Sequence, residues 1–302
     1  MKQAFGRALR GLIVAVALAT SIGAYGAATA SAAAPDCAGR GVPDSKISVQ
    51  LWTFAEYTNF LSDPVRTEEV LRRLSEMGYR NVEPFGDIDA ESFRGLLDKY
   101  GLKASARHVD IGTPENPADI EQIIADNKTL GIKYFGNGST PIFPPIYTTE
   151  AEWVAYAEYL DQVGEQARKA GQRLMVHNHD IEFETVFGDQ TVFDILMANT
   201  DPRNVVFQLD LYWADNGGAD PIALIEEYGN RIQLFHVKDA RASDGRIEIV
   251  GEGTIDFPSI FAAAGGSTRY YVVEHDPRFG DPTFDPFEAA EKGFAYLDCV
   301  TY

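Results

Sequence analysis

Short apolar segments alternate with amphipathic segments that end at glycine throughout residues 46–297. The segment Pro64–Met77, for example, carries apolar residues at helical spacing on one face and stops before Gly78. Alternation of apolar strands and amphipathic helices requires a parallel sheet. The eight strand–helix units predict an α/β fold, a single (β/α)8 TIM barrel over residues 46–302. The alternative, a doubly wound open sheet, would need a Gly-rich phosphate loop after the first strand, and the sequence has none there.

The predicted strands end in polar, charged or aromatic residues, and in chain order these are Trp52, Glu83, His108, Asn137, His177 with His179, Asp210, His236 and Glu274. In a barrel of this type, the C-terminal ends of the strands form the active site. His177 and His179 lie two residues apart, so they face the same side of their strand. The pattern therefore predicts one functional site that collects imidazoles and carboxylates.

A mixture of imidazole and carboxylate ligands suits a borderline divalent ion such as Mn²⁺, Zn²⁺, Co²⁺ or Fe²⁺. Calcium and magnesium sites use oxygen ligands and would not employ two histidines. Structural zinc sites are closed cages that prefer cysteine. We therefore predict one divalent metal ion at an open site that leaves room for substrate oxygens.

Other residues near the predicted strand ends suit substrate contacts. Lys238 lies two residues after His236 and can either donate to a substrate oxyanion or form a salt bridge with Glu83 or Glu274. Glu83 and His108 are expected to contact the substrate or to support the metal ligands. Trp52 and Trp213 offer aromatic surfaces for sugar rings, with core packing as the alternative for each.

These motifs resemble the xylose isomerase-like TIM-barrel superfamily, and the segments that carry the resemblance are 82–84, 176–179, 209–210, 235–239, 250–253 and 273–274. In that superfamily one divalent ion is held by a Glu, an Asp, a His and a Glu from the late strands. The resemblance implies His177, Asp210, His236 and Glu274 as the ligands here. His177 stands where the epimerases have a carboxylate. Either His179 is then a free base, or it replaces His177 as the ligand.

The resemblance implies a divalent-metal-dependent enzyme of the sugar isomerase/epimerase type. Glu274 or His179 would remove a proton next to a carbonyl, and the ion would stabilise the enediolate. Two alternatives are a lyase that performs β-elimination on 3-oxo-glycosides and a carbohydrate-binding barrel without turnover. The endonuclease branch of the superfamily is disfavoured, because Tyr212 and Trp213 stand where it has further ligands. The expected partner is a small-molecule sugar or glycoside, and a homo-oligomer is left open.

The N-terminal segment resembles a secretory signal peptide. Three cations, Lys2, Arg7 and Arg10, precede an apolar run at residues 11–19, which is too short to span a bilayer. We expect a signal peptide at 1–32, a linker at 33–45, no stable membrane anchor and a secreted or periplasmic protein. In an oxidising compartment the two cysteines, Cys37 and Cys299, would pair, because a closed barrel brings its ends together. Two free thiols are the alternative.

The formal net charge of −19 argues against nucleic-acid binding. A phosphate backbone is repelled by such a surface unless a basic patch compensates, and the sequence has no such patch.

Overall fold

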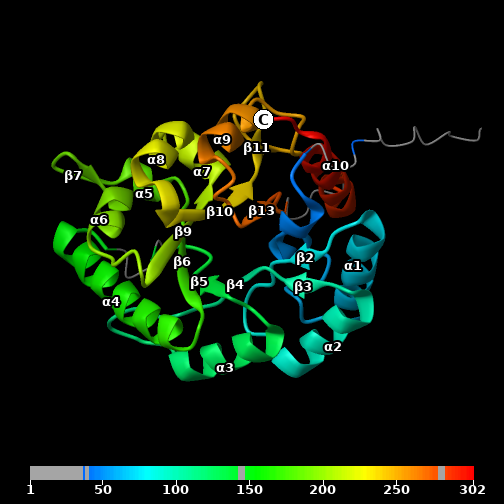
Figure 1. The fold of residues 1–302 in the computed structure, drawn as a ribbon, viewed down its shortest axis with the longest axis horizontal. Coiled ribbons are helices and arrows are strands. Elements are labelled where there is room, and N and C mark those ends of the chain that lie inside the picture. Colours follow the sequence, from blue (N-terminus) through cyan, green and yellow to red (C-terminus); the bar gives the residue numbers. More distant parts are fainter. Residues whose placement is uncertain (1–36, 38–40, 142–146, 278–282) are drawn as a thin grey trace, which may run out of the picture. The chain divides into compact units, whose positions relative to one another are not determined.

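The structure, a computed structural model, describes residues 37, 41–141, 147–277 and 283–302. The predicted signal peptide and most of the predicted linker before residue 41 lie outside the described residues. All described residues belong to one compact unit, Pro35–Tyr302. Figure 1 shows its strands at the centre and its helices around them, which is a TIM-barrel-like α/β fold.

Seven of the described strands form a parallel sheet with the order β1 (Ile47–Val49), β13 (Tyr270–Val273), β10 (Ile232–Val237), β9 (Val205–Asp210), β6 (Arg173–His177), β5 (Tyr134–Gly136) and β4 (Ala106–His108). Strand β2 (Asn81–Val82) pairs in parallel with β3 (Lys103–Ala104). Backbone bonds join the segment after β2 to both neighbours: Glu83 N donates to Val49 O at 2.8 Å and His108 N donates to Pro84 O at 3.0 Å. The predicted α/β barrel with parallel strands is therefore confirmed at the level of architecture.

The helices of the described residues are α1 (Pro64–Met77), α2 (Ala90–Tyr100), α3 (Ile120–Leu130), α4 (Glu150–Lys169), α5 (Ile181–Glu184), α6 (Val192–Ala198), α7 (Leu211–Asn216), α8 (Pro221–Tyr228), α9 (Phe257–Ala264) and α10 (Pro286–Cys299). Side-chain caps start many of them. Asp63 accepts from the backbone N–H groups of Val65 and Arg66 at the start of α1, and Gly78 ends that helix with a φ of 110°. No described helix is long and apolar enough to cross a membrane.

One strand end differs from the sequence prediction, and short elements follow several of the other strands. The first strand ends at Val49, and a 3-10 helix (Leu51–Phe54) follows because the Gln50 side chain caps it by accepting from Trp52 N at 3.2 Å. Trp52 therefore lies on this short helix and not at a strand end. Helix α7 begins directly after Asp210, whose carboxylate caps it. The polar segment after His236 forms a two-stranded hairpin of β11 (Asp239–Ala240) and β12 (Ile247–Glu248), and a second hairpin joins β7 (Val186–Phe187) to β8 (Gln190–Thr191).

The termini of the described barrel are covalently joined. Cys37 and Cys299 form a disulfide, with their Cα atoms 4.9 Å apart, so the predicted pairing is confirmed. Next to it, Val42 N donates to Leu297 O at 2.8 Å. Both contacts tie the segment before β1 to α10.

A small apolar cluster supports the site from below. Its buried members are Ala106, Tyr134, Met175, Val206 and Leu234. Ala106, Met175 and Leu234 each lie two residues before a histidine, so they share that histidine's side of the strand. The site residues thus stand on a packed layer of apolar side chains.

Candidate metal centre and active site

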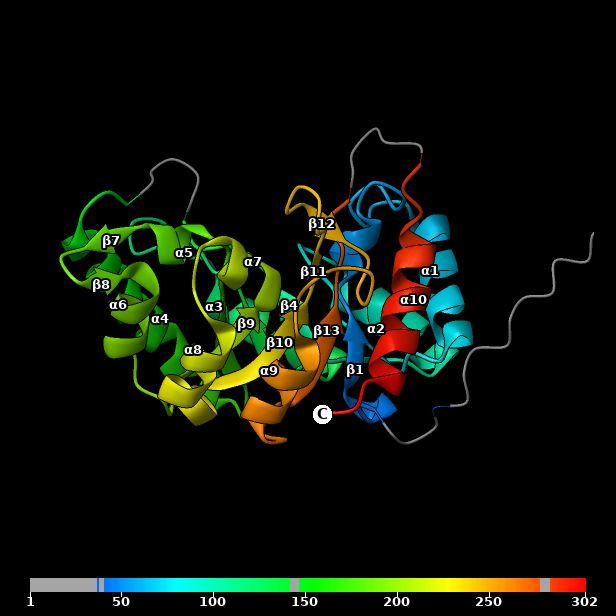
Figure 2. The ribbon, with the colours of Figure 1, turned by 90° about the horizontal axis from the view of Figure 1, so that it is seen from above.

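A cavity of about 680 Å³ lies over the C-terminal ends of the strands. Figure 2 shows α5, α7 and the β11–β12 hairpin at this end of the barrel. The predicted strand-end residues that line the cavity are Trp52, His108, Asn137, His177, His179 and Glu274, and Lys238 lines it as well. Glu83, Asp210 and His236 are fully buried and do not line it. The volume falls within the 300–1,000 Å³ typical of small-molecule sites.

Asp210, His236 and Glu274 form a compact group with their ligand atoms within 4.8 Å of one another. Nδ1 of His236 lies 2.5 Å from Glu274 Oε2 and 3.8 Å from Asp210 Oδ2. The ring of His177 approaches the same group, with Nε2 at 4.0 Å from Asp210 Oδ2. The structure therefore brings the four expected ligands to one place.

His177 Nδ1 is buried without a hydrogen-bond partner, and the buried Asp210 Oδ2 has no hydrogen bond beyond its ion pair with the Lys238 ammonium at 3.2 Å. Buried polar atoms with so few partners cost free energy, which a bound cation would offset. Burial, followed by the influence of His236 and His108, holds the pKa of His177 well below its usual value, so the ring is neutral and has a lone pair to share. Two carboxylates, the neutral His177 ring and the His236 ring, which would release its Nδ1 proton on binding, are a suitable donor set for a borderline divalent ion.

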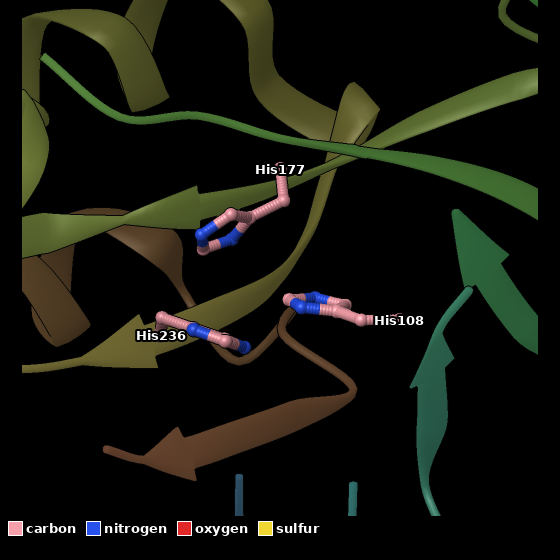
Figure 3. A group of neighbouring side chains, drawn as sticks. All are labelled: His108, His177 and His236. Atoms are coloured by element: carbon pink, nitrogen blue, oxygen red, sulfur yellow. The ribbon is translucent and has the colours of Figure 1, made fainter. Parts of the chain in front are cut away.

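Three imidazoles from different strands lie close together (Figure 3). The rings of His108, His177 and His236 also have ligand atoms within 4.8 Å of one another. His108 is nevertheless engaged elsewhere: its Nε2 contacts Gln208 Oε1 at 2.7 Å and its Nδ1 lies 3.4 Å from Gln50 Nε2. Because these partners make Nε2 the donor and Nδ1 the acceptor, we assign His108 a neutral, hydrogen-bonding role.

Glu83 is the centre of this buried network. Its carboxylate accepts from Gln50 Nε2, Gln208 Nε2 and His236 Nε2, each at 2.8 Å. Burial opposes its ionisation, but His108 and His236 outweigh burial and lower the pKa of Glu83. Glu83 was expected to contact substrate or to support the ligands, and it lies below the cavity as a partner of His236.

The group of Asp210, His236 and Glu274 brings carboxylates and an imidazole into close contact, and the pKa of each of the three is shifted. Burial alone would lower the pKa of His236, but the Glu274 and Glu83 carboxylates raise it to about 10. Burial likewise disfavours the ionised form of Glu274, yet Lys238 and His236 hold its pKa below the usual range. Burial raises the pKa of Asp210 to about 6, against the opposing influence of Lys238 and His236.

Lys238 is 1% exposed and forms salt bridges with three carboxylates. Its Nζ lies 3.2 Å from Asp210 Oδ2, 3.1 Å from Glu274 Oε2 and 3.0 Å from Asp276 Oδ1. Of the two salt bridges expected from the sequence, the one with Glu274 is formed. Asp276 was not predicted as a site residue, although it lies two residues after Glu274 and thus had the same spacing signal as His179.

His179 stands on the wall of the cavity beside Trp213, with 5.3 Å between their ring centroids. Burial, followed by the positive charge of Lys238, lowers the pKa of His179 to about 3, so its ring is neutral. Its backbone N donates to the buried Glu182 at 2.7 Å, and Thr140 also donates to that carboxyl group.

The two tryptophans expected to offer aromatic surfaces pack against other side chains. The ring of Trp213 has its centroid 5.6 Å from the Lys238 ammonium, and Trp52 packs edge-on against Phe85 with 5.2 Å between ring centroids.

Comparison with known proteins gives matches over most of the chain. A model of the family described as "xylose isomerase-like TIM barrel" matches residues 71–298. An inosose dehydratase from Geobacillus kaustophilus is 26% identical over 283 residues, which cover 80% of this chain and 90% of that protein. An inosose dehydratase from Lacticaseibacillus casei is 31% identical over 174 residues, covering 50% of this chain, and the match spans only 56% of that relative.

Solved structures with a similar fold also cover most of this chain. A sugar phosphate isomerase/epimerase from Parabacteroides distasonis has a TM-score of 0.69 and 27% identity, covering 86% of this chain and 96% of that chain. The IOLI protein, solved with a zinc atom, has a TM-score of 0.60 and 16% identity, covering 84% of this chain and 98% of that chain. This second likeness concerns the fold alone.

Proposed function

Because the chain belongs to the xylose isomerase-like TIM-barrel family, we propose that it is a divalent-metal-dependent sugar isomerase or epimerase. It would remove a proton next to a carbonyl group. The observation that carries the proposal is the group of Asp210, His236 and Glu274 beside the neutral His177, under a cavity of about 680 Å³. The relatives named above, inosose dehydratases and an isomerase/epimerase, support enzyme activity on sugars or cyclitols.

His177, Asp210, His236 and Glu274 would hold the ion. A divalent ion in this position supplies Lewis-acid polarisation of a carbonyl and a neighbouring hydroxyl. Zn²⁺, Co²⁺, Mn²⁺ and Fe²⁺ all suit the donor set, and the zinc atom in the IOLI structure is compatible with it. Glu83 would keep the Nε2 proton on His236, so that Nδ1 faces Asp210 and Glu274.

Proton transfer falls to the side chains that reach the cavity. Glu274 is ionised at neutral pH and lines the cavity, so its carboxylate can take the proton next to the carbonyl. The Lys238 ammonium lines the same cavity and would stabilise the negative oxygen of the resulting enediolate. His179, with a neutral ring, would exchange a proton on the other side of the substrate. Return of the proton to a new carbon gives an isomer, and its return to the opposite face gives an epimer.

Elimination is the second candidate, and the names of the curated relatives favour it. A dehydratase removes a proton next to a carbonyl and expels a hydroxyl group from the next carbon. The same arrangement would expel the glycosidic oxygen of a 3-oxo-glycoside. Isomerisation, epimerisation and elimination all begin with the same proton abstraction.

Solvent exchange tests the shared step. The full-length protein with Mn²⁺, Co²⁺ or Zn²⁺ would be incubated in D₂O with ketohexoses, an inosose and a 3-oxo-glucoside, and the products followed by NMR. We expect deuterium at the carbon next to the carbonyl of at least one substrate. The E274Q variant should lower this rate by about 10²–10⁴-fold. Binding of a sugar without any exchange would instead favour the non-catalytic carbohydrate-binding barrel.

We further propose that the protein is exported. The Cys37–Cys299 disulfide supports this location, because disulfides persist mainly in oxidising compartments. Fractionation of the producing cells, with an antibody against the barrel, tests it. Recovery of the uncleaved chain with the cytoplasmic fraction would contradict export.

A further inference from the structure

The Lys238 ammonium forms salt bridges with both carboxylates of the group that could hold an ion. Asp210 Oδ2 and Glu274 Oε2 lie 3.2 Å and 3.1 Å from Nζ, and both residues belong to the group that can hold a metal. An ion and the ammonium are both cations, so they compete for these carboxylates. The third partner, Asp276, lies 3.0 Å from Nζ and is outside that group.

We propose that Asp276 is the positioning residue for Lys238: it holds the ammonium in the cavity wall when an ion takes Asp210 and Glu274. The inference rests on the proposed function, because it concerns the same metal centre. It assigns to Asp276 a role that the sequence motifs do not indicate.

The surroundings of Lys238 leave Asp276 as the carboxylate that can pair with the ammonium when an ion occupies Asp210 and Glu274. Lys238 is 1% exposed, so its charge requires an anionic neighbour at all times. Asp276 extends from just beyond β13, lines the cavity together with Lys238 and has a side chain that is 28% exposed. The face of Trp213 lies 5.6 Å from Nζ and adds a favourable wall for a cation.

Two consequences follow for the site. With Asp276 present, the ammonium can give up Asp210 and Glu274 without losing its last anionic partner, so an ion binds more tightly. The ammonium also stays at the cavity surface, where it can donate to an oxygen of the substrate. Without Asp276, Lys238 would keep its contacts with Asp210 and Glu274 and oppose the ion.

Calorimetric titration of the metal-stripped, full-length protein with Zn²⁺ and with Co²⁺ tests the proposal, with no sugar present. The D276N variant should bind these ions about tenfold more weakly than wild type, the size of effect seen when partners of metal ligands are removed. The matched control is D110N, which removes a carboxylate from the same cavity without touching Lys238. The D110N variant should stay within about threefold of wild type.

A double-mutant cycle separates positioning from the simple loss of a negative charge. The K238M variant removes the competing ammonium, so adding D276N to it should change the affinity by less than about threefold. If D276N weakens binding equally with and without Lys238, Asp276 acts through its own charge and the proposal is wrong. An unchanged affinity in D276N alone also overturns it.

A second measurement does not depend on the variants folding. In a crystal structure of the wild-type protein with Zn²⁺, Nζ of Lys238 should lie within hydrogen-bond distance of Asp276 and no longer contact Asp210 Oδ2. An ammonium that leaves Asp276, or remains on Asp210, contradicts the proposal. The D₂O exchange test can succeed while these tests fail, so a wrong role for Asp276 is distinguishable from a wrong proposed function.

Discussion

The carboxylate of Glu83 accepts a hydrogen bond from Nε2 of His236 at 2.8 Å, and both side chains are fully buried. Histidine ligands of metal ions commonly donate their second ring N–H to a carboxylate, which fixes the tautomer and the ring orientation. Because Glu83 holds Nε2, the ring atom that would face an ion is Nδ1, once the proton that it shares with Glu274 at 2.5 Å is released.

The E83Q variant should bind Zn²⁺ or Co²⁺ about 10–100-fold more weakly, because a glutamine cannot hold the Nε2 proton of His236 as firmly. Titration calorimetry measures the change. The matched control is E182Q, which alters another fully buried carboxyl group, one that accepts from His179 N and Thr140. Equal ion affinities in E83Q and wild type would contradict this role of Glu83.

Substitutions of His177 and His179 should have different effects, the first on ion binding and the second on turnover. The H177A variant should lower ion affinity by at least about 100-fold, since it removes a ligand and not merely a ligand's partner. The H179A variant should keep its ion affinity and lower the rate of deuterium exchange by about 10²–10⁴-fold. Calorimetry and NMR on the two variants check the assignment. The reverse pattern would make His179 the ligand and His177 the base.

The barrel and the order of its site residues were predictable because both depend on local pattern. Apolar strands, amphipathic helices and terminal glycines gave α1 with the bounds that the structure has. The positions of His177, Asp210 and His236 at strand ends follow from the same alternation. Pairing of Cys37 with Cys299 follows from the closed ring of strands.

The hydrogen-bond network was not predictable, because it depends on which side chains meet across the barrel. Gln50 and Gln208 carry no motif, yet they join Glu83 to His108, one from the residue after β1 and the other from β9. The sequence placed Glu83 near a strand end without indicating that its carboxylate turns below the cavity. Asp276 has the same two-residue spacing from Glu274 that His179 has from His177, but no motif of the sequence marked it.

Glu182 should make stability depend on pH. Burial raises the pKa of its carboxyl group to about 7 from an ordinary value of 4.5. The folded state therefore binds the proton more tightly than the unfolded state does, and stability falls as pH rises from 4.5 to 7. The loss is on the order of 3 kcal/mol, from about 1.4 kcal/mol for each unit of pKa.

Denaturant unfolding of wild type and E182Q at pH 4.5 and pH 8 tests this dependence, because other titrating groups are common to both proteins. Wild type should lose more stability than E182Q between the two pH values. Parallel losses in the two proteins would show that Glu182 titrates normally.

Removal of the disulfide should destabilise the barrel strongly. Cys37 and Cys299 are 262 residues apart in sequence, and closing so long a loop stabilises by about 5 kcal/mol in the chain-entropy model. The double variant C37S/C299S should unfold at clearly lower denaturant concentration, and wild type under reducing conditions should behave in the same way. Unfolding midpoints that do not respond to either change, together with two reactive thiols in the intact protein, would contradict the disulfide.

The central claim is that four side chains from the late strands hold one divalent ion. The most direct measurement is an anomalous difference map, recorded at the cobalt edge, from crystals grown with Co²⁺. The account predicts a single strong peak in contact with His177, Asp210, His236 and Glu274. A map with no peak among these residues, or a peak bound only by residues elsewhere, would contradict it.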